Sequence, residues 1–162
     1  MKVLSFEIEG WDEFIEGIVL NESEEWIEIV DNYHDLRLDG IKFVKRDHIL
    51  YDFHEEDEIF KENVFRTMKQ IRPSTGYVLD SNLINELKNL EIVMFELEED
   101  DVCFIGKIIK SDSEKLQLLT MTSKAEWSDE MNIRLSDIRT ISIDNEYLNT
   151  LLSYNKKMLR AV

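Results

Sequence analysis

Three histidines and a single cysteine are the side chains of this 162-residue chain best suited to proton transfer or nucleophilic attack. A general base needs a nucleophile or a second proton-carrying group within hydrogen-bonding reach. No serine–histidine or cysteine–histidine signature surrounds His34, His48 or His54, and Cys103 falls inside a predicted strand where a small apolar residue fits. We therefore predict no catalytic residue and a protein that is not an enzyme.

The densest group of oxygen ligands is residues 54–58, a histidine followed by four acids. Consecutive residues on a helix point in different directions, so they cannot all converge on one ion. The chain also has neither EF-hand spacing nor paired Cys and His spacing. We interpret the run as charge at the start of a helix and expect no metal site.

Phosphate-binding motifs are missing, since the sequence contains neither GxGxxG nor GxxxxGK[ST]. We therefore expect no nucleotide and no other cofactor. The one basic knot in the first half, Lys42, Lys45 and Arg46, is outnumbered by four nearby aspartates. Nucleic-acid binding needs a basic stripe with interleaved aromatics, so we do not expect it here.

The formal net charge is −16 and it is spread unevenly. Residues 1–81 contain 20 Asp and Glu against 9 Lys and Arg, whereas residues 82–162 contain 15 against 10. Such a field repels phosphate backbones and anionic lipids and attracts basic surfaces. The alternative reading is that the charge only keeps the protein in solution.

The chain contains an internal repeat with an offset of 89 residues. Residues 4–53 align with residues 93–142 without a gap, with seven identical pairs that include Gly17 and Gly106. Fourteen of the 20 apolar residues between positions 4 and 49 meet an apolar residue in the second copy, where composition alone predicts about nine. The same face is therefore expected to be buried twice.

Each copy is predicted to form five short strands. Leu4, Phe6 and Ile8 alternate with polar residues, which is typical of a half-buried first strand. Gly17 and Gly106 fall inside the second strands, where glycine usually marks a bend or a close backbone approach. The remaining predicted strands contain Ile29, Val44 and Ile49, and their equivalents Leu118, Ile133 and Ile138.

A helix is predicted after each copy, over residues 55–70 and 145–159, because apolar residues recur there with a 3.6-residue period. We divide the chain into a first module with its helix (1–72), a linker with a short helix (73–90) and a second module with its helix (91–162). The linker begins at the only proline of the chain, and this proline is followed by the turn residues Ser, Thr and Gly.

Five short, bent strands with a glycine inside the second strand resemble the small SH3-like and Sm-like β-barrels. The resemblance covers residues 3–53 and 92–143, and the tight turns before Ile49 and Ile138 fit it. It implies two tandem five-stranded barrels, each followed by a C-terminal helix; the alternative is one continuous sheet with helices on one side. The Arg-Gly pair of the Sm signature is missing at residues 46–48 and 135–137. The Leu-Asp-Gly turn at residues 38–40 is also similar to a family of small uncharacterised bacterial proteins.

Trp11, Trp26 and Tyr33 each align with a polar residue in the second copy, so the shared core does not require them. Trp and Tyr are enriched at interface hot spots. We predict an acidic and aromatic docking surface on the first module. Its acidic members are Glu22, Glu24, Glu25 and Glu28. The alternative is that the aromatic residues pack under the helices or between the modules.

The sequence favours a non-catalytic, acidic protein-binding module, of the inhibitor or immunity type, whose partner is a basic protein. One alternative is an Sm-like RNA-associated or oligomeric scaffold protein; another is an enzyme with a site between the modules. The chain shows no signal peptide, no apolar stretch of membrane-spanning length and one cysteine. We therefore expect a cytoplasmic protein that does not associate with membranes.

Overall fold

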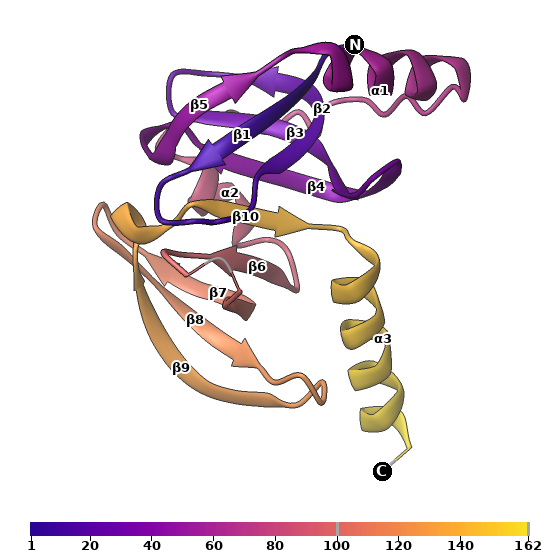
Figure 1. Ribbon diagram of the computed structural model, residues 1–162. Coiled ribbons are helices and arrows are strands. Elements are labelled where there is room, and N and C mark those ends of the chain that lie inside the picture. The colour runs from indigo at the N-terminus through magenta and orange to yellow at the C-terminus, as the bar shows by residue number, and fades with distance from the viewer. Residues whose placement is uncertain (100, 162) are drawn as a thin grey trace.

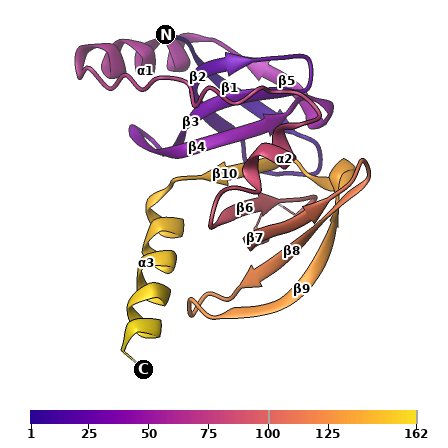
Figure 2. The same cartoon turned by 180° about the vertical axis from the view of Figure 1, so that it is seen from behind.

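The computed structural model describes residues 1–99 and 101–161, which form strands and three helices (Figures 1 and 2). The first half contains β1 (Val3–Ile8), β2 (Ile15–Glu22), β3 (Trp26–His34), β4 (Arg37–Lys45), β5 (Ile49–Phe53) and α1 (Glu56–Thr67). A linker with α2 (Leu83–Leu87) follows. The second half contains β6 (Val93–Glu96), β7 (Cys103–Ser111), β8 (Lys115–Met121), β9 (Trp127–Arg134), β10 (Thr140–Ile143) and α3 (Glu146–Arg160).

The prediction of two tandem five-stranded barrels is wrong. The described strands form a single antiparallel sheet in the order β5-β1-β2-β3-β4-β10-β6-β7-β8-β9, and this sheet is not closed. A barrel would require β4 to pair with β5 of its own half. Instead β4 pairs with β10, from Val44 opposite Thr140 to Ile41 opposite Ile143. Each of these strands satisfies the backbone groups that the other would leave open as an edge.

The two halves nevertheless share one strand order, β5-β1-β2-β3-β4 and β10-β6-β7-β8-β9. The glycines of the second strands have a common physical reason. A Cβ atom on Gly17 would lie 2.3 Å from the Val30 carbonyl oxygen, and one on Gly106 would lie 2.0 Å from that of Leu119. Only glycine permits the neighbouring strand to approach this closely.

The predicted elements are found with small shifts at their ends. The helices expected over residues 55–70 and 145–159 correspond to α1 and α3, and the short linker helix is reduced to α2. The last strand begins at Thr140 rather than at Ile138, because a 3₁₀ turn over Leu135–Asp137 comes first.

One large apolar core runs through both halves. Phe43 of β4, Phe95 of β6 and Ile141 of β10 are fully buried in it. The linker contributes Leu83 and Leu87 of α2, which are also fully buried. The paired strands β4 and β10 therefore lie over a core that neither half builds alone.

Candidate functional site

Two members of the predicted docking surface are buried. Trp26 is 4% exposed and lies in the shared core, where the ammonium group of Lys45 sits 5.7 Å from its ring centroid. Glu28 is fully buried, and its carboxylate accepts hydrogen bonds from Ser74 Oγ (2.9 Å) and from the Thr75 amide (2.7 Å). Both side chains face inward, and Glu28 fixes the linker to the sheet.

Trp11 lies between the halves, as the alternative reading has it. Its indole Nε1 donates a 2.8 Å hydrogen bond to the carbonyl oxygen of Leu97, which follows β6. Nearby, His48 bridges the halves in the same way, with Nδ1 3.1 Å from Glu9 and Nε2 2.7 Å from the carbonyl oxygen of Ser136. These residues join the first half to the second.

The other predicted members do not form one surface. Glu22, Glu24 and Glu25 gather at the turn between β2 and β3, where Glu22 pairs with Arg46 at 2.7 Å. Tyr33 is 55% exposed near the far end of β3. Protein binding by Glu22, Glu24, Glu25 and Tyr33 stays a prediction.

A buried ion cluster formed by residues of β3, β4 and β6 joins the two halves. Lys42 Nζ lies 3.1 Å from Asp31 and 3.2 Å from Glu96 of β6. Burial raises the pKa of Asp31. Burial alone would lower the pKa of Lys42, but the two carboxylates outweigh it and raise that pKa. Lys42, which the sequence analysis grouped with Lys45 and Arg46, therefore links the first half to β6 of the second half.

An acidic pocket with aromatic walls lies where β1, β2 and β5 meet the start of α1. Its volume is about 660 Å³. Phe14 and Phe53 stack with ring centroids 5.5 Å apart, and Phe14 is 59% exposed. The charged residues that line the pocket are Glu16, Glu55, Glu56, Asp57, Glu58 and Lys61. We call this site the acidic pocket.

Hydrogen bonds hold the floor of the acidic pocket in place. Ser5 Oγ lies 2.6 Å from Glu58 and 3.0 Å from Glu16, and Lys61 donates to Glu16 at 2.7 Å. The Glu58 carboxylate also accepts from the Glu55 amide in a capping box. Burial opposes the charge on Glu58, but hydrogen bonds from Ser5 and from backbone amides outweigh it and lower the pKa of this carboxyl.

Sequence reasoning missed the acidic pocket because its parts are far apart along the chain. The acidic run was correctly placed at a helix start, but nothing indicated that β2 and β5 bring Phe14 and Phe53 beside it. One signal existed. Phe53 aligns with the polar Ser142 in the repeat, so the comparison that singled out Trp11 also applies to Phe53.

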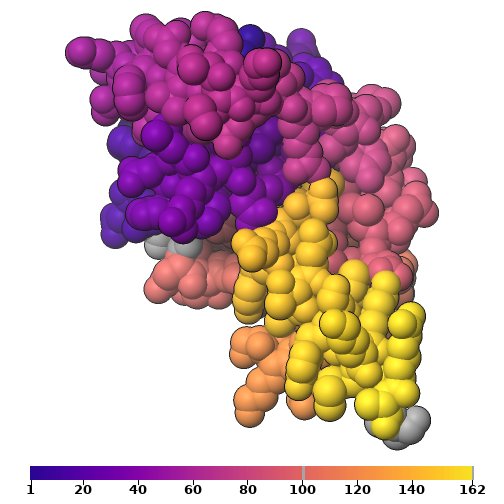
Figure 3. Space-filling view, turned by 90° about the vertical axis from the view of Figure 1, so that its right-hand side faces the viewer, coloured from indigo at the N-terminus to yellow at the C-terminus, as the bar shows by residue number. Residues whose placement is uncertain are grey.

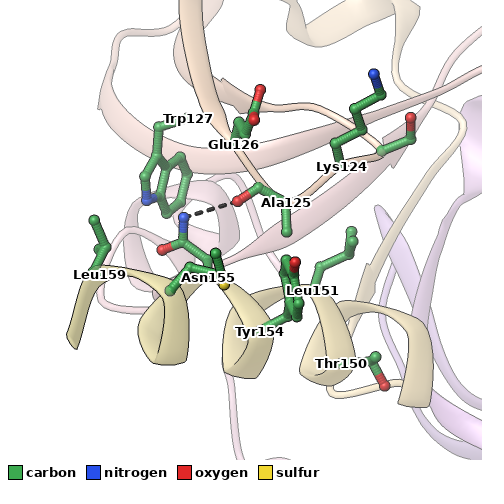
Figure 4. A pocket seen from close by; sticks show the side chains of 11 residues that line it. Lys124, Ala125, Glu126, Trp127, Thr150, Leu151, Tyr154, Asn155 and Leu159 are labelled. Carbon is green, nitrogen blue, oxygen red and sulfur yellow. Dashed lines mark hydrogen bonds between the residues drawn. The ribbon is translucent and has the colours of Figure 1, made fainter. Parts of the chain in front are cut away.

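A second, apolar groove of about 880 Å³ lies between α3 and the turn that joins β8 to β9 (Figure 4). The buried Asn155 fixes this arrangement, because its Nδ2 donates a 2.8 Å hydrogen bond to the carbonyl oxygen of Ala125. Trp127, Leu151 and Tyr154 contribute apolar surface to the groove. No charged residue lies at its centre in Figure 4; Lys124 and Glu126 are on the turn.

Within residues 1–99 and 101–161, no three His, Cys, Asp or Glu side chains are grouped so that they could hold a metal ion. None of the helices in these ranges combines the length and the apolar character needed to cross a membrane. Comparison with known proteins found no protein-family model, no curated protein and no solved structure that matches this chain. The function can therefore be inferred only from the two sites themselves.

Proposed function

We propose that this protein is a non-catalytic, acidic binding module that docks a basic segment of a protein partner in the acidic pocket. The observation that carries the proposal is the exposed Phe14–Phe53 stack beside five carboxylates and one lysine. Lys and Arg side chains combine an apolar stem with a cationic head. The rings offer a surface for the stem and for cation–π contact, and the carboxylates attract the head.

The electrostatics favour a cationic guest over other ligands. The whole chain carries −16, and the acidic pocket concentrates part of that negative charge, with five carboxylates against one lysine. This field speeds association with a basic surface and disfavours phosphate-bearing ligands. An inhibitor-type role is part of the same proposal, because an acidic surface can bind and block a basic partner. The proposal also includes a reducing, cytoplasmic setting.

The acidic pocket is also organised before any ligand arrives. The capping box fixes the first turn of α1, and the Ser5–Glu58 hydrogen bond ties that turn to β1. Side chains that are already ordered lose less conformational freedom on binding. A partner would therefore meet the carboxylates of Glu16, Glu55 and Glu58 in fixed positions.

Titration calorimetry with a hexa-arginine peptide tests the proposal. The pocket variant combines Phe14→Ala, Glu56→Gln and Asp57→Asn, and its control combines Glu24→Gln and Glu25→Gln, which removes the same charge from the acidic turn. We expect the pocket variant to bind the peptide about tenfold more weakly than the wild type, because it loses ring contact and local charge together. We expect the control to change affinity by less than about twofold.

The control variant distinguishes binding in the acidic pocket from a general effect of net charge. Equal losses in the two variants would mean that only net charge matters, and would contradict the assignment of the acidic pocket. A larger loss in the turn variant would instead support the surface around Glu24 and Glu25. Absence of binding by the wild-type protein at low salt would contradict the proposed function as a whole.

A further inference from the structure

Strand β5 has a free edge. It lies at the end of the sheet, where it pairs with β1 on one side only. Among the described residues, residues 50–53 make no backbone hydrogen bond outside this ladder. Leu50 has no partner in the register, so the regular part of the edge is Tyr51–Phe53. Alternate amide and carbonyl groups of this part therefore point away from the sheet without a backbone partner.

Aromatic side chains continue the acidic pocket along this edge. Side chains two residues apart on a strand point to the same face. Phe53 lines the acidic pocket, so Tyr51 lies on the face that carries the pocket. Tyr51 is 67% exposed, and Phe14, which stacks on Phe53, is 59% exposed. The three rings therefore follow one another from the pocket along the strand.

The charge around this edge is negative and uncompensated. Four carboxylates border the edge and form no ion pair among the described residues. They are Glu7, which is opposite Tyr51 on β1, Asp52 of β5 itself, and Glu56 and Asp57 at the start of α1. Lys61, the one lysine of the acidic pocket, is already paired with Glu16 at 2.7 Å. An incoming strand would therefore meet negative charge along the whole edge.

We propose that the basic segment of the partner binds as an additional strand on the free edge of β5. This inference rests on the proposed function, because it gives the conformation in which the guest of the acidic pocket binds. Backbone hydrogen bonds to β5 supply affinity, and alternate side chains supply specificity. On one face, Lys or Arg side chains lie over Tyr51 and Phe53, towards Glu56 and Asp57. On the other face, they lie beside Asp52.

A second copy of this chain does not suit the same edge. Among the described strands, the only other open edge is that of β9, which carries Asp129 and Glu130. Like charges opposite one another destabilise a sheet, so Asp52 disfavours this pairing and favours a strand that carries Lys or Arg. β5 and α1 lie at one end of the molecule and α3 at the other, so a strand on β5 does not approach α3 (Figures 1 and 3).

Titration calorimetry on the full chain with three hexa-arginine peptides of equal charge tests the proposal. One peptide is unmodified, one is N-methylated along its whole backbone, and one is N-methylated at every second residue. Successive amides of a strand point to opposite edges, so the fully methylated peptide has no amide hydrogen on either edge, whereas the alternately methylated peptide keeps one edge intact. We expect the fully methylated peptide to bind at least about tenfold more weakly than the unmodified one, because it cannot donate to the carbonyl groups of β5. The alternately methylated control should bind within about threefold of the unmodified peptide.

The outcomes separate this inference from the proposed function. Equal binding by all three peptides would overturn strand addition and leave the proposed function intact, because the acidic pocket would then hold side chains alone. An equal loss in both methylated peptides would also overturn strand addition, since the loss would not depend on an intact strand edge. If the unmodified peptide does not bind at low salt, the proposed function is wrong and the inference is wrong with it.

Hydrogen exchange with and without the unmodified peptide locates the added strand. The outward-facing amides of Tyr51–Phe53 should become protected at saturation, and those of β9 should not change. Tyr51→Ala should weaken peptide binding about threefold, because this ring lies on the edge but outside the acidic pocket. Its control is Tyr33→Ala, at a tyrosine of β3 that is 55% exposed, which should bind like the wild type. Protection of β9 in place of β5, or unchanged binding by Tyr51→Ala, would contradict the proposal.

Discussion

In the repeat, the central strand β4 corresponds to β9 at one end of the sheet, and the central strand β10 corresponds to β5 at the other end. The central strands carry apolar residues at positions where the end strands carry polar ones. On β4, Ile41 and Phe43 are buried in the shared core. The residues 89 positions later, on β9, are Glu130 and Asn132, and both are exposed. One repeat position thus carries an apolar residue where a neighbouring strand is present and a polar one where the sheet ends.

The fifth strands differ in the same way. Ile141 and Ile143 of β10 are buried, whereas their equivalents Asp52 and His54, on or next to β5, are exposed. Polar and charged side chains on an edge strand discourage further pairing. The duplicated unit therefore extends its sheet once, at the centre, and side chains rather than strand order determine where pairing stops.

The largest expected effect on stability comes from truncating an apolar side chain of the central strand β4. Phe43→Ala leaves a cavity in the shared core and should lower the free energy of unfolding by about 3–5 kcal/mol. The matched change Phe14→Ala, at a ring that is 59% exposed, should cost far less. Urea denaturation of both variants measures the difference. Similar costs would mean that the core does not depend on the central strand pair.

The next effect comes from the ion cluster. Lys42→Met leaves Asp31 and Glu96 buried without their cation and should cost about 3 kcal/mol near neutral pH. The folded-state pKa of Lys42 is raised above 10.5, so its charge contributes fully below that pH and the contribution disappears as the pH rises through the raised value.

Urea denaturation of wild type and Lys42→Met at several pH values checks this prediction. The difference in stability should be constant around neutral pH and should close at strongly alkaline pH. It should also narrow in acid, because the pKa of Asp31 is already raised by burial and its carboxyl is readily protonated. A difference that does not depend on pH would show that Lys42 acts only by filling space.

A smaller effect is expected at the outer contact between the halves. Trp11→Phe keeps an aromatic ring but removes the hydrogen bond to Leu97, which should cost about 1 kcal/mol. Thermal denaturation gives the change in melting temperature. The melting temperature of Trp11→Phe should fall less than that of Phe43→Ala. An equally large fall would mean that the Trp11–Leu97 contact, rather than the β4–β10 pair, is the main connection between the halves.

The smallest effect on stability, but a change in assembly, is expected at the sheet ends. Glu130→Ile, Asn132→Phe and Asp52→Ile together restore part of the central pattern to β9 and β5. Unfolding free energy should change by less than about 0.5 kcal/mol, as at other exposed positions. Light scattering should detect larger assemblies than the wild type forms. Asp129→Ile, on the opposite face of β9, is the control and should not add to assembly.

The sequence predicted the strands, the helices and the two close-packed glycines, because these depend on local periodicity and on residue type. It could not predict the partner of β4. The alternation of Ile41, Phe43 and their neighbours is the same whether β4 pairs with β5 or with β10. Trp26 and Glu28 were misplaced for a related reason, since they are buried by a linker that has no counterpart in the repeat.

The acidic pocket shows the same limit. The pocket needs β2, β5 and α1 to meet, and no local pattern encodes that meeting. A site formed between elements was therefore not accessible to sequence reasoning.

Native-state hydrogen exchange of the strand amides tests the central claim, that β4 and β10 join the halves into one sheet. We expect the paired amides of residues 41–44 and 140–143 to exchange only through global unfolding, because both strands are interior. The outward-facing amides of β5 and β9 should exchange much faster. If the amides of β4 and β10 exchange as fast as those of the two end strands, the halves are not joined as described here.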